Sequence, residues 1–431
     1  MLEVEDVKAK VVAIASKPAR SSRILENGCI LSVGTENLLA LLRDGGPQPT
    51  ASLGDLVNSS RSKAMQDLAE LESLGLVTRG GKAPSRGGRR STIVSLSDSL
   101  RYVGVDVGAT SVSVAVTGGY LNVLQYAEEE SDVRSGPVAI LDQVERMIRE
   151  AFGVASGPLP AAGVGLGLPS PVSFSTGRPV APPLMPGWDN YPARDELAAR
   201  LGTAVTVDND VNIMALGEKH SGIARSQDDF LFVKLGTGVG CGIVVEGEIY
   251  RGRDGCAGDI GHIRAGDPTI SCHCGRTGCL EAQVGGHALA RAAILGAQSG
   301  ESPRLEARLR EQGRLTAMDI SRANEFGDPF ANRTIRRSGQ VLGEALAGIV
   351  NFFNPALIVL GGGVSGFGQL LLAELRSVVL DRSTPLATSG LQLELSTARE
   401  RAGVIGAAWL ASDTFLRHAT NAPAALPASA G

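Results

Sequence analysis

The sequence has few aromatic residues and no large excess of charge of either sign. Aromatic residues make up 4 % of the 431 residues, and the net charge is −4. Hydrophobic residues contribute 43 % and charged residues 20 %. This is the composition of a globular protein, so it excludes a wholly disordered chain. The small negative net charge also excludes attraction of nucleic acid by overall charge alone.

Long uninterrupted apolar runs are missing as well. The longest candidate, residues 343–363, is interrupted by Asn351, Asn354 and Pro355, whereas a membrane-spanning helix needs about 20 mostly apolar residues. The N-terminus lacks a charged segment followed by an apolar core and a cleavage site, the pattern of a secretory signal. We therefore expect a soluble, cytoplasmic protein with no membrane partner.

The first hundred residues have the element order of a winged helix-turn-helix. Residues 36–44 and 52–58 are predicted to form helices, and a third helix is capped by Ser59 or Ser60 and ended by Gly75. Two short strands, 76–78 and 93–96, follow and flank a loop rich in Gly and Arg. Three helices followed by a hairpin is the order found in that DNA-binding domain.

Candidate DNA contacts lie in two parts of this region. The N-terminal end of the third helix would enter the major groove, and it carries Ser60, Arg61, Ser62, Lys63 and Gln66. The loop at 79–90 has five basic residues and no acidic one, so it would lie along the backbone or minor groove with Arg86, Arg89 and Arg90. The alternative is an amphipathic helix beside a solvated loop. The element order next to the basic run favours DNA binding.

After Tyr102, glycine-rich turns alternate with apolar strands. Residues 105–116 (VDVGATSVSVAV) and 233–244 (VKLGTGVGCGIV) share one design of strand, small-residue turn and returning strand. This weak duplication predicts two α/β lobes, each with a phosphate-facing hairpin. Asp106, beside Gly108 and Thr110, would orient Mg²⁺ or a metal-bound water near the phosphates, and the three glycines at 361–363 add a further turn of this kind. The alternative is that small residues serve hairpin geometry alone.

Asn209 and Asp210 follow the strand AVTVD. A carboxylate at the C-terminal end of a strand lies where α/β folds bind ligands. Asp210 could accept the proton of a sugar hydroxyl as general base, and Asn209 could hydrogen-bond a neighbouring hydroxyl. Helix capping is the alternative, and on spacing alone it is favoured.

Three cysteines lie within eight residues, at Cys272, Cys274 and Cys279. Together with His262 they form a Cys₃His set, which is a common structural zinc site. Gly275 and Gly278 allow the tight turn that the set requires. A redox role is disfavoured because there is no C-x-x-C pair. Asp259 and Glu281 flank this loop and could bind vicinal sugar hydroxyls, although each alone is better explained as a solvated charge.

These motifs together resemble the ROK family of sugar-responsive repressors and sugar kinases. The most specific part is GDIGH followed by CHCGRTGCLE, which resembles the zinc signature of that family. VDVGAT, VDNDVN, KLGTGVG and VLGGG follow the family's order, and GLVTRGGKAPSRGGRR resembles the wing of its repressor branch. The resemblance covers about residues 33–412. It implies an actin-like, hexokinase-type domain of two α/β lobes behind the winged helix.

The resemblance also implies roles for individual residues. Asp210 would be the catalytic base and Asn209 a sugar contact, while Asp259, His262 and Glu281 would line the sugar site, with His262 also a zinc ligand. The phosphate-facing positions would be Asp106, Gly108, Thr110, Thr237 and Gly238. Gly361 and Gly362 would lie near adenosine.

The sequence departs from the kinase pattern on the nucleotide side. Ala109 stands where the kinases usually have a second glycine, and its Cβ would crowd a phosphate or disfavour a positive φ. Asp259 replaces a usual Glu, Ser111 follows Thr110 where Lys is frequent, and Pro183 replaces a frequent Asn. These departures favour sensing over phosphorylation.

We therefore predict a sugar-responsive, DNA-binding repressor that carries structural zinc. It would bind operator DNA and a sugar or sugar phosphate, and it would form a homodimer or homotetramer. The alternative is a sugar kinase that uses Mg-ATP and has an attached DNA-binding domain. We expect four segments: a flexible leader at 1–28, the winged helix at 29–98, the ROK-like domain at 99–412 and a tail at 413–431.

Overall fold

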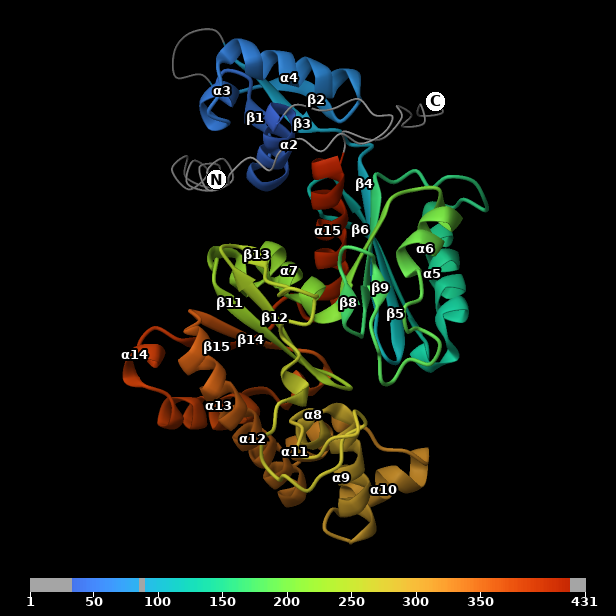
Figure 1. Cartoon of the computed structure of the whole chain (residues 1–431), viewed down its shortest axis with the longest axis vertical. Coiled ribbons are helices and arrows are strands. Elements are labelled where there is room, and N and C mark those ends of the chain that lie inside the picture. The colour runs from blue at the N-terminus through green and yellow to red at the C-terminus, as the bar shows by residue number, and fades with distance from the viewer. Residues whose placement is uncertain (1–32, 85–89, 419–431) are drawn as a thin grey trace.

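A small N-terminal domain sits on a larger two-lobed body (Figure 1). The computed structural model describes residues 33–84 and 90–418, so the predicted leader, Arg86 and Arg89 lie outside the described residues. The N-terminal elements are α2 (Val33–Gly45), β1 (Gln48–Pro49), α3 (Leu53–Leu56), α4 (Arg61–Ser73), β2 (Val77–Lys82) and β3 (Thr92–Leu96). The strands form one sheet in the order β1-β3-β2, and this sheet with the three helices is consistent with the predicted winged helix-turn-helix.

Local chemistry explains the limits of these helices. The Ser60 hydroxyl accepts a hydrogen bond from the Lys63 amide at 3.2 Å and caps α4. Leu38, Leu42, Leu53 and Leu68 are fully buried, because apolar residues on one face of each helix meet in a common core. The predicted second helix is too long, since only four residues form α3. The two-residue β1 was not predicted because it is too short to produce an alternating pattern.

The body contains two five-stranded sheets with the same topology. The first has the order β10-β7-β4-β5-β6 and the second β13-β12-β11-β14-β15. In each, a three-strand antiparallel meander is extended by two parallel strands. The predicted duplication is thus present as a repeated sheet. The strands are β4 (Arg101–Val107), β5 (Ser111–Gly118), β6 (Val123–Glu130), β7 (Gly163–Leu168), β10 (Val205–Asn209), β11 (Phe230–Leu235), β12 (Val239–Val245), β13 (Glu248–Ile249), β14 (Leu357–Gly361) and β15 (Gln392–Leu395).

Helices cover both sheets. Their bounds are α5 (Pro137–Phe152), α6 (Ala193–Leu201), α7 (Asp210–Ser221), α8 (Glu281–Val284), α9 (Gly286–Gln298), α10 (Pro303–Gln312), α11 (Ala317–Glu325), α12 (Pro329–Phe353), α13 (Gly368–Arg382), α14 (Pro385–Thr388) and α15 (Ala402–His418). A short pair, β8 (Val172–Ser173) and β9 (Arg178–Pro179), forms a separate ribbon. Five 3₁₀ turns complete the connections: Val133–Ser135, Ile223–Ser226, Ile260–His262, Gly363–Phe367 and Arg399–Arg401.

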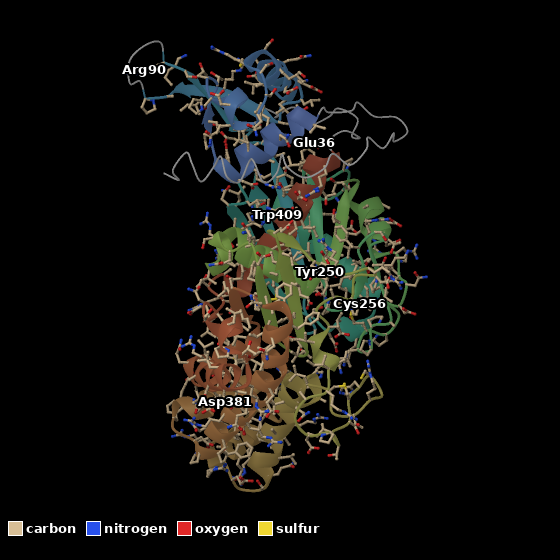
Figure 2. The ribbon with its side chains drawn as sticks, turned by 60° about the vertical axis from the view of Figure 1, so that its left-hand side comes forward. Glu36, Arg90, Tyr250, Cys256, Asp381 and Trp409 are labelled. Carbon is tan, nitrogen blue, oxygen red and sulfur yellow. The ribbon has the colours of Figure 1, made fainter. Side chains whose placement is uncertain are left out.

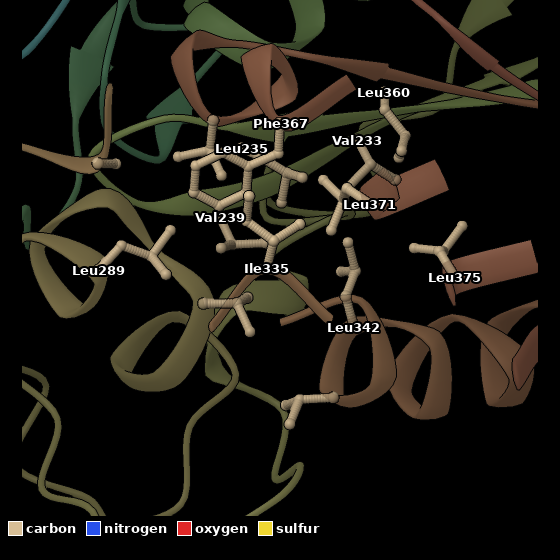
Figure 3. Close-up of a cluster of buried hydrophobic side chains, with 14 of the residues drawn as sticks. Val233, Leu235, Val239, Leu289, Ile335, Leu342, Leu360, Phe367, Leu371 and Leu375 are labelled. Carbon is tan, nitrogen blue, oxygen red and sulfur yellow. The ribbon is translucent and has the colours of Figure 1, made fainter. Parts of the chain in front are cut away.

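The core of the second lobe lies between its sheet and helices α12 and α13 (Figure 3). Leu235 and Leu360 from the sheet are fully buried with Leu342 and Leu375 from the helices. Among the described residues, one helical stretch, Gly363–Arg382, is long and apolar enough by composition to cross a membrane. Its buried leucines belong to this core, and a core helix of a globular protein meets the same criterion.

Helix α15 joins the three parts of the molecule. It packs against α7, β4, β7 and α2, and Figure 1 shows it in red directly beneath the N-terminal domain. Its approach to the first sheet needs glycine: a Cβ at Gly104 would lie 1.8 Å from the Val404 carbonyl oxygen, and one at Gly165 would lie 1.9 Å from that of Ala407. The helix continues to His418, so the predicted tail from residue 413 begins inside its last turns.

We expect Gly165→Ala to destabilise the protein by about 2 kcal/mol or more, because the new methyl group meets helix backbone that cannot rotate away. Gly348→Ala on the exposed side of α12 is the control. No atom lies within 4 Å of its Cβ position, so we expect it to stabilise by about 0.5–1 kcal/mol. Chemical denaturation of both variants measures the difference. Equal midpoints would contradict the close packing of α15.

Candidate functional site

Asp106, Asp210 and Lys234 form a charged cluster between the lobes, which we call the interlobe site. Asp106 lies near the end of β4, Asp210 begins α7 and Lys234 lies near the end of β11. The Lys234 ammonium donates to Oδ2 of Asp210 in a short ion pair. Its side chain is 19 % exposed and that of Asp210 is 5 % exposed, so the pair is largely shielded from water.

The titration behaviour of the cluster follows from burial and charge. Burial raises the pKa of Asp106 to about 7; Lys234 acts to lower it, whereas Asp210 and Glu128 raise it. Burial disfavours the charged form of Lys234, but the attraction of Asp210 and Asp106 outweighs this and raises the pKa of Lys234 above its ordinary value. Lys234 is therefore a cation at neutral pH.

Asn209 acts as a helix cap in this structure. Its side-chain oxygen accepts from the amides of Val211 and Asn212, and Nδ2 donates to the Ser170 carbonyl at 2.9 Å. The capping alternative is thus what the structure shows. One Nδ2 hydrogen remains for a ligand hydroxyl.

The residue before Asn209 forms a buried ion pair that the sequence did not predict. Asp208 is 2 % exposed and accepts two hydrogen bonds from Arg251, at 2.9 and 2.7 Å. It also accepts from the side chain of Asn212. The available signal was Asp208 itself, a further acidic residue in the run VDNDVN. Its partner Arg251 lies 43 residues away in the sequence, so the pair could not be predicted.

Glu281 links the cysteine-rich loop to the second hairpin. Its Oε2 accepts the Val239 amide at 3.0 Å, at the start of β12. Lys234 lies at the other side of the same hairpin, because Leu235 pairs with Val239. The predicted sugar contacts Asp210 and Glu281 are therefore both attached to one β-hairpin. Asp259 is exposed and makes no capping hydrogen bond.

The predicted metal ligands come together. One donor atom from each of His262, Cys272, Cys274 and Cys279 lies within 4.8 Å of the others. The Cys274 and Cys279 sulfurs are 3.7 Å apart, close to the edge of about 3.8 Å expected for tetrahedral ligands at Zn–S distances. Gly275 and Gly278 have φ values of +84° and +77°, as the predicted tight turn requires. The set fits a four-coordinate metal.

The predicted phosphate-facing and adenosine-facing positions lie in three separate turns. Gly108 closes its turn by donating to Ser111, and Thr110 is exposed. Thr237 and Gly238 form the second turn, where a Cβ at Gly238 would lie 2.3 Å from Glu281. Gly361 ends β14 and Gly362 has a φ of +87°.

Of the two predicted effects of Ala109, the conflict with a positive φ does not arise, while the crowding of a phosphate stays a prediction. Ala109 is not among the described residues that have a positive φ. Its methyl group packs against the buried hydrophobic residues of the first lobe.

The candidate DNA contacts that the structure describes are exposed to solvent. Ser60, Arg61, Ser62, Lys63 and Gln66 are all exposed at the N-terminal end of α4. Lys63 also forms an ion pair of 2.7 Å with the buried Asp67. Arg90 is exposed and lies on the β2–β3 hairpin at the outer edge of the domain (Figure 2).

Two repeated α/β lobes with a small N-terminal domain define a protein that has the fold of the sugar kinases and an added N-terminal domain. The sequence pattern of the ROK family matches residues 102–414, and the chain belongs to the ROK family.

The chain resembles both enzymes and regulators. It is 34 % identical over 314 residues to a glucokinase of Halalkalibacterium halodurans, covering 72 % of this chain and 94 % of that protein. It is 27 % identical over 361 residues to a xylose repressor of Caldicellulosiruptor bescii, covering 82 % and 89 %. Among solved structures, a ROK family transcriptional regulator described as a homologue of the E. coli MLC protein matches with a TM-score of 0.74 and 25 % identity. That match covers 89 % of this chain and 96 % of the other.

The raised pKa of Asp106 predicts a specific pH dependence. Because its folded pKa of about 7 exceeds its ordinary value of 3.8, the folded state binds the proton more tightly. The contribution of this group to stability is therefore full below about pH 4 and is lost as the pH rises towards 7. We therefore expect the melting temperature of the native protein minus that of Asp106→Asn to decrease as the pH rises from about 4 to about 7. A difference that stays constant or increases over this pH range would contradict the raised pKa of Asp106.

Proposed function

We propose that the protein is a cytoplasmic, sugar-responsive DNA-binding repressor whose ROK domain binds a sugar and alters the affinity of the winged helix for its operator. One observation carries this proposal: α15 packs on α7, which begins with Asp210, and also contributes Ala408, Ala411 and Leu416 to the core of the N-terminal domain. The candidate sugar site and the DNA-binding elements therefore lie on one continuous packed path. Similarity to a xylose repressor and to a ROK transcriptional regulator over most of the chain supports the proposal.

Three side chains connect the ends of this path. The His220 ring at the end of α7 stacks on Trp409 of α15, with centroids 4.2 Å apart and planes at 15°. The Arg43 guanidinium of α2 lies 4.9 Å from the Trp409 ring centre, and Arg43 also approaches Asp413 of α15 at 3.7 Å. Trp409 lies just below the N-terminal domain in Figure 2. Movement of α7 on ligand binding would therefore reach α2 directly.

The DNA contacts follow from the exposed end of α4. Arg61 and Gln66 would reach base edges, while Ser60, Ser62 and Lys63 would hold phosphates. Arg90 and the wing would follow the adjacent backbone. We propose a dimer or tetramer, because two such domains would read half-sites about one helical turn apart.

The test is binding to DNA from around the promoter of the protein's own gene, with and without sugars from a panel of hexoses, pentoses and N-acetylated sugars. We expect salt-sensitive binding that one sugar changes. Arg61→Ala should weaken specific binding by about 1–3 kcal/mol if Arg61 contacts a guanine. Arg253→Ala, at a side chain that is 91 % exposed on the ROK domain, is the matched control and should have no effect. Absence of salt-sensitive DNA binding would refute the proposal.

A sugar kinase is the second candidate. It is supported by the glucokinase relative and by Asp210 at the start of α7. That reaction would need Mg²⁺ to neutralise the charge of the nucleotide phosphates. The interlobe residues fit a divalent cation poorly, because Oδ2 of Asp210 already holds the Lys234 ammonium, which also places a positive charge beside Asp106. Release of ADP with Mg-ATP and the same sugars, lost in Asp210→Asn, would establish the kinase.

The Cys₃His set would hold one structural Zn²⁺ and so fix the loop that leads to Glu281. We expect one zinc per chain by elemental analysis. Cys274→Ala should lose the metal and loosen the loop, because three ligands cannot close the tetrahedron. Cys256→Ala is the control, since Cys256 is exposed and outside the set. A zinc-free native protein, or full zinc retention in Cys274→Ala, would contradict the assignment.

A further inference from the structure

Asp106 and Lys234 occupy equivalent positions in the two halves of the repeat. Asp106 is followed by Val107 and Gly108, and Lys234 by Leu235 and Gly236. Each residue lies near the end of the first strand of its own sheet, β4 or β11, and those strands have the same place in the two topologies. The duplication thus places a carboxylate in one lobe and an ammonium at the matching position in the other.

The ammonium is enclosed by acidic groups. It forms the ion pair with Asp210 and is attracted to Asp106. Oδ1 of Asp106 is buried and has no hydrogen-bond partner among the described residues. The other Asp106 oxygen packs against the first turn of α15, where a Cβ at Gly403 would lie 1.9 Å from it. Asp106 and Asp210 are close enough for their charges to repel each other, so a cation stabilises them, and Lys234 supplies it from within the chain.

We propose that Lys234 is a built-in cation that takes the place of a divalent metal between Asp106 and Asp210, so that this site binds a neutral sugar and transfers no phosphoryl group. This inference rests on the proposed function, since it names the chemical class of the ligand. A divalent metal would need carboxylate oxygens as ligands, but Oδ2 of Asp210 already holds the ammonium, and the fixed positive charge of Lys234 beside Asp106 repels a second cation. The three groups together carry a net charge between −1 and 0 near neutral pH, because the pKa of Asp106 is about 7, so they offer no net positive charge to a phosphorylated sugar.

The same arrangement gives Asp210 a role in binding. The Lys234 ammonium occupies Oδ2 of Asp210, so this oxygen is not free to take a proton from a hydroxyl group. It can still accept a hydrogen bond from a sugar hydroxyl, because a carboxylate has about four acceptor sites. Asp210 would therefore recognise the hydroxyl without deprotonating it.

The test measures metal binding, ligand class and turnover on the full-length protein. Mn²⁺ serves as a paramagnetic probe for the metal, and its binding is followed by electron paramagnetic resonance. We expect no Mn²⁺ binding to the native interlobe site and no ADP release with Mg-ATP and the sugar panel. We also expect glucose or N-acetylglucosamine, whichever binds, to bind at least about tenfold more tightly than its 6-phosphate. Mn²⁺ binding that Asp106→Asn abolishes, ADP release lost in Asp210→Asn, or tighter binding of the phosphate would each overturn the proposal.

Two variants test Lys234 itself. Lys234→Met removes the charge while keeping a chain of similar length, so the freed carboxylates should gain Mn²⁺ affinity of about tenfold or more. Lys234→Arg keeps the charge and should gain none. A folded Lys234→Met protein that gains no Mn²⁺ affinity would overturn the proposal. If Lys234→Met does not fold, the native-protein measurements still decide.

Failure of this inference differs from failure of the proposed function. If no sugar binds and no operator responds, the regulator proposal fails, while the Mn²⁺ measurements still report on Lys234. If a sugar changes DNA binding but the native site also binds Mn²⁺ and releases ADP, the regulator stands and only the built-in cation is refuted.

Discussion

The close approach of α15 to its neighbours is the constraint on which the rest of the structure depends. Glycines in β4 and β7 allow the helix backbone to lie directly against the first sheet, and Gly406 makes a comparable contact with the Ile213 carbonyl of α7. A helix held this closely cannot shift alone, so movement in α7 must be shared with α15. Because the far end of α15 belongs to the core of the N-terminal domain, this one helix would transmit a displacement from the lobes to that domain. The proposed control by a sugar would act through this helix.

The charge pattern between the lobes indicates what such control responds to. A fold built from a repeated half brings two equivalent strand ends together, and this chain has opposite charges at those positions. Lys234 supplies a positive charge to both carboxylates of this cluster. A neutral ligand can exchange hydrogen bonds with it at little electrostatic cost, whereas a metal–nucleotide complex must displace an ion pair. In the proposed function, this one side chain would distinguish a sensor from a kinase that has the same fold.

Local sequence signals predicted much of this structure, and long-range contacts account for what they missed. The metal set was predictable because its four ligands lie within eighteen residues and two glycines permit the turn. The repeated strand–turn–strand pattern predicted the duplicated sheets, and Ser60 predicted the start of α4. The Asp210–Lys234 pair was not predicted, because it depends on how the lobes face each other. The same is true of Arg43, His220 and Trp409, which come from three distant segments. Capping by Asn209 was foreseen as the alternative, and the structure shows it.

The most direct test of the account is the thermodynamic coupling between sugar and DNA in a protein whose α7–α15–α2 contact is broken. Operator affinity is measured with and without the effective sugar in the native protein, Trp409→Leu and His220→Leu, and sugar affinity is measured with and without DNA. Linkage requires that, in each protein, the factor by which the sugar changes operator affinity equals the factor by which DNA changes sugar affinity. We expect the folded variants still to bind DNA and sugar separately, while the factor by which the sugar changes operator affinity falls towards one. An undiminished ratio in both folded variants would contradict the claim that this contact carries the signal.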